Sequence, residues 1–324
     1  MSRVSVLVAV YNGEKYLRET LDSLLGQTLR DIQIVCIDDA STDSTPEILA
    51  EYSSADDRII VLTQRENTGQ AVARNNGIGY CTGDYITMVD ADDMLSADAL
   101  EKAVEKLDSD DRLGCVLFNL KYLYGNGSLV DYPKATVERE WTGFEAFCLS
   151  LDWSIHGLYV ARAELYRRFP FDAACRLYSD DNTTRLHYLN SERVGVCQGL
   201  YIYRQHEASM TNSDSIRRFD LLEANTSMAV QIAGQPAEVR AVFEKERWIN
   251  MVGLYGYLLK YRPMLSADEE MQVLDRIRRV YQTVDRSLLP AGLRLKFGYM
   301  PLCGFAAFRI QANLYFALRR IAGK

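Results

Sequence analysis

Residues 4–37 run VSVLVAVYNGEKYLRETLDSLLGQTLRDIQIVCI, with an apolar segment on either side of an amphipathic one. Segments 4–10 and 32–37 are nearly continuous in apolar residues and rich in β-branched ones, which is typical of strands covered on both faces. Between them, leucines recur at helical spacing until Gly26 ends the stretch. A strand, a helix and a strand in close succession predict neighbouring parallel strands.

The same alternation continues to residue 89. Thr45 and Pro46 supply a capping hydroxyl and a proline suited to the first turn, so a helix is expected to about residue 52. Strands are expected at 59–62 and 85–89, with a helix at 69–79 between them. The pattern predicts an α/β fold with a Rossmann-like, doubly wound and mostly parallel sheet flanked by helices.

The rest of the chain changes character twice. Residues 113–203 mix short strand-like and helix-like runs, whereas residues beyond about 213 have an almost entirely helical pattern. We therefore expect an α/β region over 1–212 and a helical C-terminal extension over 213–324. The last segment can be wound as a helix with an apolar side (Ile310, Leu314, Tyr315, Leu318 and Ile321) and a basic side (Arg309, Arg320 and Lys324), although Phe305 and Phe316 break this segregation.

Charge is distributed unevenly along the 324 residues. The net charge is −7, with −12 in residues 1–110, −2 in 111–214 and +7 in 215–324. An acidic first part argues against nucleic acid as a partner. From Arg286 to the end there are seven basic residues and no acidic one, which favours peripheral contact with an anionic membrane surface or, equally, packing within the fold or between copies.

Composition and cysteine usage indicate an ordinary globular protein of the cytoplasm. Hydrophobic residues make up 48% and charged residues 25%, which excludes intrinsic disorder. The seven cysteines include no C-x-x-C pair, so reduced thiols are expected rather than disulfides or a zinc site. No signal peptide and no membrane-spanning helix are expected, because the chain has neither a leader pattern nor about 18 consecutive apolar residues.

Two acidic clusters follow predicted strands. Asp90, Asp92 and Asp93 come directly after the strand YITMV, where open α/β sheets bind ligands. Carboxylates at this position suit Mg²⁺ or Mn²⁺ bridging a pyrophosphate, although they are equally compatible with a solvated acidic turn. The second cluster, 38–43, contains Asp39, which we expect to point into the cleft toward a nucleoside while Thr45 caps the next helix.

Other nucleotide-binding motifs are absent from the sequence. A dinucleotide-binding domain needs G-x-G-x-x-G in the first strand-to-helix turn, and residues 10–15 contain one glycine. No G-x-x-x-x-G-K-[ST] sequence occurs either.

Four blocks in order resemble family 2 glycosyltransferases of the GT-A fold, inverting and of the bacterial cell-surface glycan type. They are VSVLVAVYNGEKYLRETLDSLLGQT, IVCIDDASTDST, NTGQAVARNNGI and GDYITMVDADD. The resemblance is close over about residues 3–107 and weaker to about 212. It implies a nucleotide-sugar-binding half over 1–110 and an acceptor and base half over 111–212.

The resemblance also implies roles for individual residues at the donor site. Ala9, Tyr11 and Asp39 would contact the nucleoside, and Arg74 would lie near the pyrophosphate. Asp92 would hold the divalent metal, with Asp90 nearer the ribose. In the stretch YIYRQHEASMT, Arg204 would neutralise the leaving diphosphate and His206 would contact metal or phosphate. Tyr201 and Tyr203 of the same stretch are otherwise expected to be core or wall residues.

The second half of the resemblance concerns the acceptor. The family's E-D pair corresponds here to Asp180 and Asp181, and we assign the general base to Asp181, whose ionised form a helix N-terminus would favour. The open alternative is that these residues only cap a helix, or that Asp180 is the base. Trp153 and His156 border the acceptor site in related enzymes, although a single tryptophan is more often a packing residue.

These observations predict a metal-dependent inverting glycosyltransferase. It would move a sugar from a nucleotide-diphosphate donor, UDP in the first instance, to a glycan or lipid-linked glycan hydroxyl at the inner face of the cytoplasmic membrane. Two alternatives remain at this point: a nucleotidyltransferase that makes an activated sugar, and a non-catalytic scaffold.

Overall fold

The computed structural model describes residues 2–133, 139–175, 177–205, 216–295 and 304–321. The chain divides into two compact units, Met1–Ser213 and Asp214–Lys324. Each unit has hydrophobic clusters made of its own residues, so the two are described separately.

The first unit alternates strands and helices from its beginning. Its strands are β1 (Val4–Val10), β2 (Ile32–Asp38), β3 (Ile59–Thr63), β4 (Tyr85–Met88), β5 (Met94–Leu95), β6 (Leu113–Leu123), β7 (Leu129–Asp131), β8 (Trp141–Thr142), β9 (Tyr159–Arg162) and β10 (Arg193–Arg204). Its helices are α1 (Leu17–Leu25), α2 (Thr45–Ala55), α3 (Gln70–Ile78), α4 (Ala99–Asp108), α5 (Gly143–Leu151), α6 (Ala163–Arg168) and α7 (Ser179–Leu189).

Within the described residues, these ten strands form one sheet in the order β3-β2-β1-β4-β9-β6-β10-β5, with β7 beside β6 and β8 beside β10. β1 pairs in parallel with β2 and β4, β2 with β3, and β6 with β10. β9 runs antiparallel between β4 and β6, so β6 and β10 run in the same direction as β1–β4. The predicted α/β fold with a mostly parallel sheet is confirmed.

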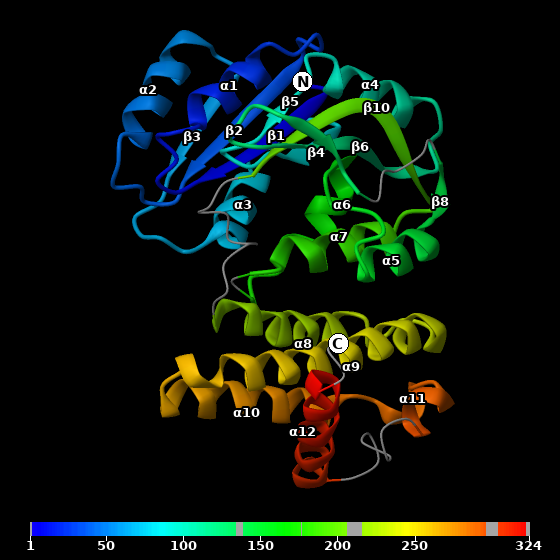
Figure 1. Cartoon of the computed structure of the whole chain (residues 1–324). Helices are drawn as coiled ribbons and strands as arrows, with labels where there is room; N and C mark the ends of the chain where they lie inside the picture. The colour runs from blue at the N-terminus through cyan, green and yellow to red at the C-terminus, as the bar shows by residue number, and fades with distance from the viewer. Residues whose placement is uncertain (1, 134–138, 176, 206–215, 296–303, 322–324) are drawn as a thin grey trace. The chain divides into compact units, whose positions relative to one another are not determined.

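Helices cover both faces of the sheet, as Figure 1 shows. Side chains of β1 alternate between the faces: Val4, Val6 and Val8 pack with α1, α2 and α4, whereas Leu7 and Ala9 pack on the side of α3. α5, α6 and α7 contribute to the α3 side. Double coverage explains why β1 and β2 are apolar runs rather than alternating ones.

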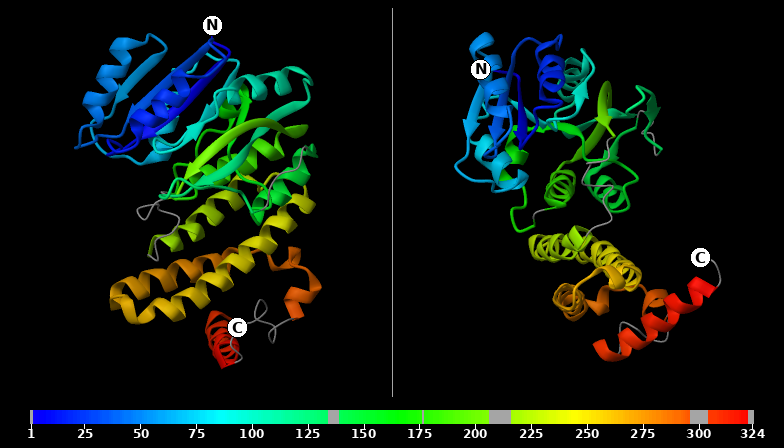
Figure 2. Two further views of the ribbon diagram at one scale, coloured as in Figure 1. Left: turned by 45° about the horizontal axis from the view of Figure 1, so that its top comes forward. Right: turned by 60° about the vertical axis from the view of Figure 1, so that its left-hand side comes forward.

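The second unit is helical, as predicted. It contains η1 (Ile216–Phe219), α8 (Asp220–Gln231), α9 (Ala237–Tyr261), η2 (Arg262–Met264), α10 (Ala267–Thr283), η3 (Arg286–Leu288), α11 (Ala291–Leu295) and α12 (Phe305–Ile321). The long helix α9 contacts α8, α10 and α12 (Figure 2). Phe305, Tyr315 and Phe316 of α12 pack against the core of this unit. The expected grouping of Tyr315 with Ile310, Leu314, Leu318 and Ile321 is wrong, because those four side chains are exposed.

Two further observations concern the whole of the described part. None of its helices combines the length and the apolarity needed to cross a membrane. Its six cysteines are free thiols.

Candidate active site

The loops after β1 and β2 are joined by hydrogen bonds at the carboxyl edge of the sheet. Asn12 and Ala40 have φ of 53° and 62°, so both loops turn sharply. The side-chain oxygen of Asn12 accepts a hydrogen bond from the Thr42 amide at 2.8 Å, and the Gly13 amide donates to the Thr45 hydroxyl at 2.8 Å. Thr45 is therefore the first residue of α2 rather than its cap, and the expected capping role is wrong because its hydroxyl anchors the first loop.

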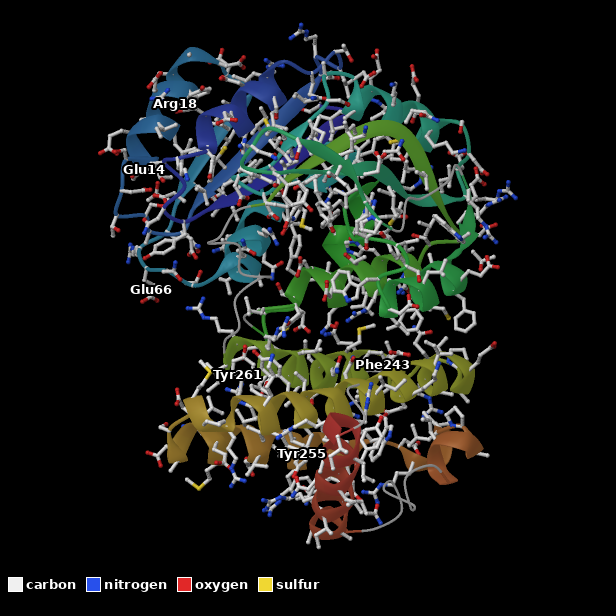
Figure 3. The ribbon with its side chains drawn as sticks, in the orientation of Figure 1. Glu14, Arg18, Glu66, Phe243, Tyr255 and Tyr261 are labelled. Carbon is white, nitrogen blue, oxygen red and sulfur yellow. The ribbon has the colours of Figure 1, made fainter. Side chains whose placement is uncertain are left out.

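Further contacts join the same two loops. The Glu14 amide (Glu14 is labelled in Figure 3) donates to the Asp43 carboxylate, and the Ser44 amide donates to the Glu14 carboxylate. Ala9 is buried at the end of β1, whereas Tyr11 is 51% exposed. Of the two residues assigned to the nucleoside here, Tyr11 therefore presents its ring to solvent.

Asp39 is buried and its carboxylate anchors the segment before α3. Its Oδ1 accepts hydrogen bonds from the Gln64 side-chain amide at 2.6 Å and from the Thr68 backbone amide at 2.8 Å. The Thr68 hydroxyl donates to the same oxygen at 3.2 Å. Its Oδ2 accepts one from the Gly69 amide at 2.8 Å. The carboxylate thus holds the loop that starts α3, and Oδ2 retains one lone pair.

Arg74 and Asp90 form an ion pair in which the guanidinium is buried and the carboxylate is partly exposed. Arg74 on α3 is 2% exposed, and its Nη2 lies 2.5 Å from Asp90 Oδ1. The guanidinium lies 5.3 Å from the centre of the Phe171 ring. Arg74 Nε and Nη1 are buried and have no hydrogen-bond partner, so two nitrogens of this cation are unsatisfied.

The turn after β4 is fastened to β10. The Tyr201 hydroxyl donates to Asp93 Oδ2 at 2.8 Å and accepts from the Asp90 amide at 3.2 Å. The Arg204 amide donates to Asp93 Oδ1 at 2.7 Å. Asp93 is 1% exposed, so it fixes the turn and leaves Asp90 and Asp92 as the more exposed carboxylates.

The Arg204 guanidinium is held close to this turn. Its Nε donates to the Asp92 carbonyl at 2.9 Å, and its Nη2 pairs with Glu19 of α1 at 2.7 Å. The same guanidinium lies 4.5 Å from the centre of the Tyr16 ring. Contact of Arg204 with a diphosphate would therefore compete with Glu19.

Asp180 and Asp181 occupy the first turn of α7, which follows Tyr178 with a φ of 66°. Asp180 is half-buried and close enough to Asp90 for its charge to raise the pKa of Asp90. Asp181 is 8% exposed, with Oδ2 3.9 Å from Arg185 Nη2 and without a hydrogen bond. Of the two carboxylates, Asp180 is the more exposed one.

Burial dominates the electrostatics of these acids. It raises the pKa of Asp90 to about 6, with Asp92 and Asp180 adding to the effect and Arg74 opposing it. Burial, then Asp90 and Asp92, raise the pKa of Asp93. Burial and Asp180 likewise raise the pKa of Asp181 against the effect of Arg185, so burial outweighs the helix N-terminus that was expected to favour the ionised form.

The carboxylate oxygens at this edge of the sheet are the kind of ligand that a hard divalent cation prefers. Mg²⁺ in enzymes is often bound by one or two carboxylates, with substrate phosphates and water completing the shell. Asp90 and Asp92 supply such oxygens, and both carboxylates are partly exposed at this edge. Across the described residues, no three His, Cys, Asp or Glu side chains converge as a complete metal site. His206 lies outside those residues.

Trp153 and His156 differ in accessibility. Trp153 is 45% exposed with a φ of 60°, and its carbonyl accepts a hydrogen bond from the Tyr132 hydroxyl at 2.9 Å. His156 is 5% exposed, and burial lowers its pKa to about 4. His156 therefore lies behind the Tyr132 ring, whose centre is 5.7 Å away.

A cluster of tyrosines adjoins Trp153. The Tyr122 ring makes edge contacts with the rings of Tyr124, Tyr132 and Tyr203 at 5.8 to 6.5 Å. Tyr122 pairs with Tyr203 where β6 and β10 end, at the same edge of the sheet as the acidic residues. We call Tyr122, Tyr124, Tyr132, Tyr203 and Trp153 the aromatic cluster.

Comparison with known sequences identifies the family. The profile of Glycosyl transferase family 2 matches residues 5–174, which is more than half of the chain. The chain is a family 2 glycosyltransferase.

Several relatives carry the same designation. Glycosyltransferase GlyG of Streptococcus pneumoniae serotype 4 is 26% identical over 311 residues, covering 88% of this chain and 98% of GlyG. Glycosyltransferase GlyA of the same organism is 33% identical over 229 residues, covering 64% of this chain but 31% of GlyA. The chain is thus an enzyme that transfers glycosyl groups, rather than one of the two alternatives left open by its sequence.

Solved structures agree on the fold. S. aureus TarS 1-349 in complex with UDP-GlcNAc matches with a TM-score of 0.76 at 21% identity, over 99% of this chain and 92% of TarS 1-349. Mannosyltransferase PcManGT from Pyrobaculum calidifontis, in complex with GDP-Man and Mn²⁺, matches with a TM-score of 0.56 at 19% identity, over 99% and 88% of the two chains. The glycosyltransferase therefore has the GT-A fold, as expected.

Some contributors to the site carried no signal in the sequence. Glu19 and Phe171 meet Arg204 and Arg74 only because distant segments fold together. Tyr201 belongs to the stretch YIYRQHEASMT and was expected as a core or wall residue, but its contact with Asp93 was not expected. Gln64 and Thr68 follow β3, and their position at a strand end was the one available hint of their contact with Asp39.

Proposed function

We propose that this glycosyltransferase is metal-dependent and inverting, and that it uses a nucleotide-diphosphate sugar, with UDP as the nucleotide. The observation that carries the proposal is the buried Arg74, with two guanidinium nitrogens unsatisfied beside Asp90. An unsatisfied buried cation is unfavourable, and diphosphate oxygens are the acceptors that match a guanidinium. Arg74 would bind the diphosphate and hold it against the turn that carries Asp90 and Asp92.

The nucleoside would lie between the loops after β1 and β2, in contact with Ala9, Tyr11 and Asp39. Tyr11 offers an exposed ring, and Asp39 Oδ2 retains a lone pair that can accept from a base N–H. The UDP-GlcNAc bound in TarS supports a uridine donor, and the GDP-Man bound in PcManGT shows that this fold also serves other nucleotides.

Asp92 and Asp90 would hold Mn²⁺ or Mg²⁺, with His206 as a further ligand. The Mn²⁺ in the PcManGT complex supports this cofactor. When bound, a divalent cation supplies Lewis-acid stabilisation of the departing diphosphate. Arg204 would add positive charge to the diphosphate after exchanging its contact with Glu19.

Asp181 would remove the proton from the acceptor hydroxyl, with Asp180 as its neighbour. A base works best when its pKa lies near the operating pH, and burial moves the pKa of Asp181 in that direction. Its unbonded Oδ2 provides a lone pair for that proton. Single displacement by the acceptor oxygen on the side opposite the diphosphate would invert the anomeric centre.

The acceptor would be a glycan or lipid-linked glycan in the synthesis of surface polysaccharide or glycoconjugates. Trp153 would offer a ring face to a sugar, with the rest of the aromatic cluster beside it and His156 as buried support. The acidic first unit argues against nucleic acid as a partner. The basic C-terminal tail would place the enzyme at the inner face of the cytoplasmic membrane.

A thermal-shift panel of UDP, GDP, TDP and CMP sugars, each with and without Mn²⁺, tests the donor site. A donor that binds only the folded enzyme raises its melting temperature, and we expect this for UDP sugars with Mn²⁺. Arg74→Met should weaken donor binding at least thirtyfold, because charge-assisted hydrogen bonds contribute about 1.5–3 kcal/mol each. The exposed Arg65→Met is the matched control. Equal donor shifts in both variants would exclude Arg74 from the site.

A further inference from the structure

Helix α12 has two apolar faces. One is buried: Phe308 and Ala312 are 0% exposed in the core of the second unit. The hydroxyl of Tyr255 on α9, labelled in Figure 3, donates to the Asn313 side chain at 2.9 Å and fixes the rotation of α12. The opposite face is therefore turned away from this core by the packing itself.

That opposite face carries four large aliphatic side chains. Ile310, Leu314, Leu318 and Ile321 are 71%, 61%, 57% and 84% exposed, and their spacing of four, four and three residues aligns them along the helix. We call them the aliphatic stripe. Single exposed leucines are ordinary, but a continuous row on one helix marks a surface that becomes covered.

The surroundings of the aliphatic stripe are basic. Arg309 and Arg320 share one flank of α12, about 80–100° around the helix axis from Ile310. At the C-terminal end of the helix, Arg319 and Arg320 join Lys260 of α9 around a cavity of about 430 Å³ whose lining contains no carboxylate. This basic surface therefore suits a negatively charged partner.

We propose that α12 lies parallel to an anionic lipid bilayer, with the aliphatic stripe inserted among the acyl chains and its arginines at the phosphates. The inference specifies the membrane contact of the proposed function and depends on that part of it, but not on the donor or the reaction. A helix with an apolar stripe, arginines beside it and too little apolarity to span is the kind that binds in the interface.

A second copy of the chain fits the same stripe less well. Residues 215–324 carry a net charge of +7, and a symmetric pairing through α12 would bring the arginines of two copies together. Anionic lipid removes this repulsion, with about a fivefold gain in affinity for each basic residue near the surface.

Sedimentation of the full chain with vesicles tests the proposal. We expect binding to phosphatidylglycerol vesicles and little binding to phosphatidylcholine vesicles. Leu314→Ser combined with Leu318→Ser should weaken binding at least tenfold, and Arg309→Gln combined with Arg320→Gln about twentyfold, with less dependence on salt. The matched control is Val230→Ser with Met271→Ser, which removes two exposed apolar side chains elsewhere in the second unit.

The remaining outcomes are separable. If the wild type binds vesicles and the stripe variant binds equally well, the stripe is not the inserted surface, although the membrane contact stands. If the wild type binds no vesicle, both the contact and the inference fail, and the donor panel is unaffected. A wild type that sediments as a dimer in analytical ultracentrifugation, with a monomeric stripe variant, would assign the stripe to a second copy and overturn the inference.

Discussion

Adjacent residues in this enzyme have very different environments, and Asp180 and Asp181 show it best. Asp180 is half-buried and acts electrostatically on Asp90, whereas Asp181 is buried beside Arg185. A single step along the helix thus separates a carboxylate that acts on Asp90 from one that is buried beside Arg185. Which of the two takes a proton depends on the surroundings of each side chain, and two adjacent aspartates in a sequence do not reveal those surroundings.

Substitution of each acid by its amide separates their roles. Asp181→Asn should leave the donor-induced thermal shift unchanged and reduce transfer at least a hundredfold, because it removes the proton acceptor and keeps the side-chain shape. Asp180→Asn should retain most transfer. Release of nucleoside diphosphate in the presence of acceptor glycans measures both variants. Loss of transfer in Asp180→Asn alone would reverse the assignment.

Buried histidines make stability depend on pH. His187 is 0% exposed, its Nε2 lies 2.8 Å from the Phe169 carbonyl and its Nδ1 lies 2.7 Å from the Tyr159 hydroxyl, so both nitrogens are satisfied in the neutral form with Nε2 protonated. Burial lowers the pKa of His187 to about 4. The unfolded chain, with an ordinary pKa of about 6.5, binds the proton first as pH falls.

The contribution of His187 to the free energy of unfolding should therefore decrease as pH falls from 6.5 toward 4, whereas the raised pKa values of Asp90, Asp93 and Asp181 act in the opposite direction. The expected loss from pH 7 to pH 5 is about 2 kcal/mol for His187, with a similar contribution from His156, whose pKa burial also lowers to about 4. Urea unfolding at pH 7, 6 and 5 measures this slope. Relative to the wild type, His187→Gln should remove about 2 kcal/mol of the destabilisation between pH 7 and pH 5, and an identical pH dependence in both proteins would show that His187 is not responsible.

At the scale of elements, the close packing of α12 against α9 depends on one glycine, Gly256. Gly256 on α9 faces α12, and an added Cβ would lie 2.4 Å from the Phe316 ring. Gly253, one turn earlier on the same helix, has nothing within 4 Å of such a Cβ. The two positions share a helical backbone and differ in what a methyl group would meet.

This pair provides a controlled test of the packing of α12. Gly256→Ala should lower the free energy of unfolding by about 1–3 kcal/mol, because Phe316 must move. Gly253→Ala should raise it by up to about 1 kcal/mol through helix propensity alone. Chemical denaturation of both variants gives the comparison. Equal gains would mean that Phe316 does not lie against Gly256.

At the scale of the molecule, the two units have independent cores. The clusters that stabilise the sheet lie within residues 4 to 203, and the cluster in the helical unit lies within residues 216 to 316. All residues assigned to the donor, apart from His206, lie in described parts of the first unit. Residues 1–213 alone should therefore melt cooperatively and retain the donor-induced thermal shift. A fragment without a cooperative transition would show that the first unit needs the second.

The sequence by itself determined the parallel α/β architecture, the strand ends that carry Asp39 and Asp90, and the helical C-terminal unit. These follow from local order, because apolar runs and helical spacing act over ten or so residues and parallel strands end at a common edge. Only the tertiary structure decided what surrounds each side chain. Arg74 meets Phe171, Tyr201 meets Asp93, and α12 keeps an uncovered stripe, because burial and pairing depend on segments far apart in the chain. Desolvation, which sets the charge of the acidic residues, follows from the same long-range packing.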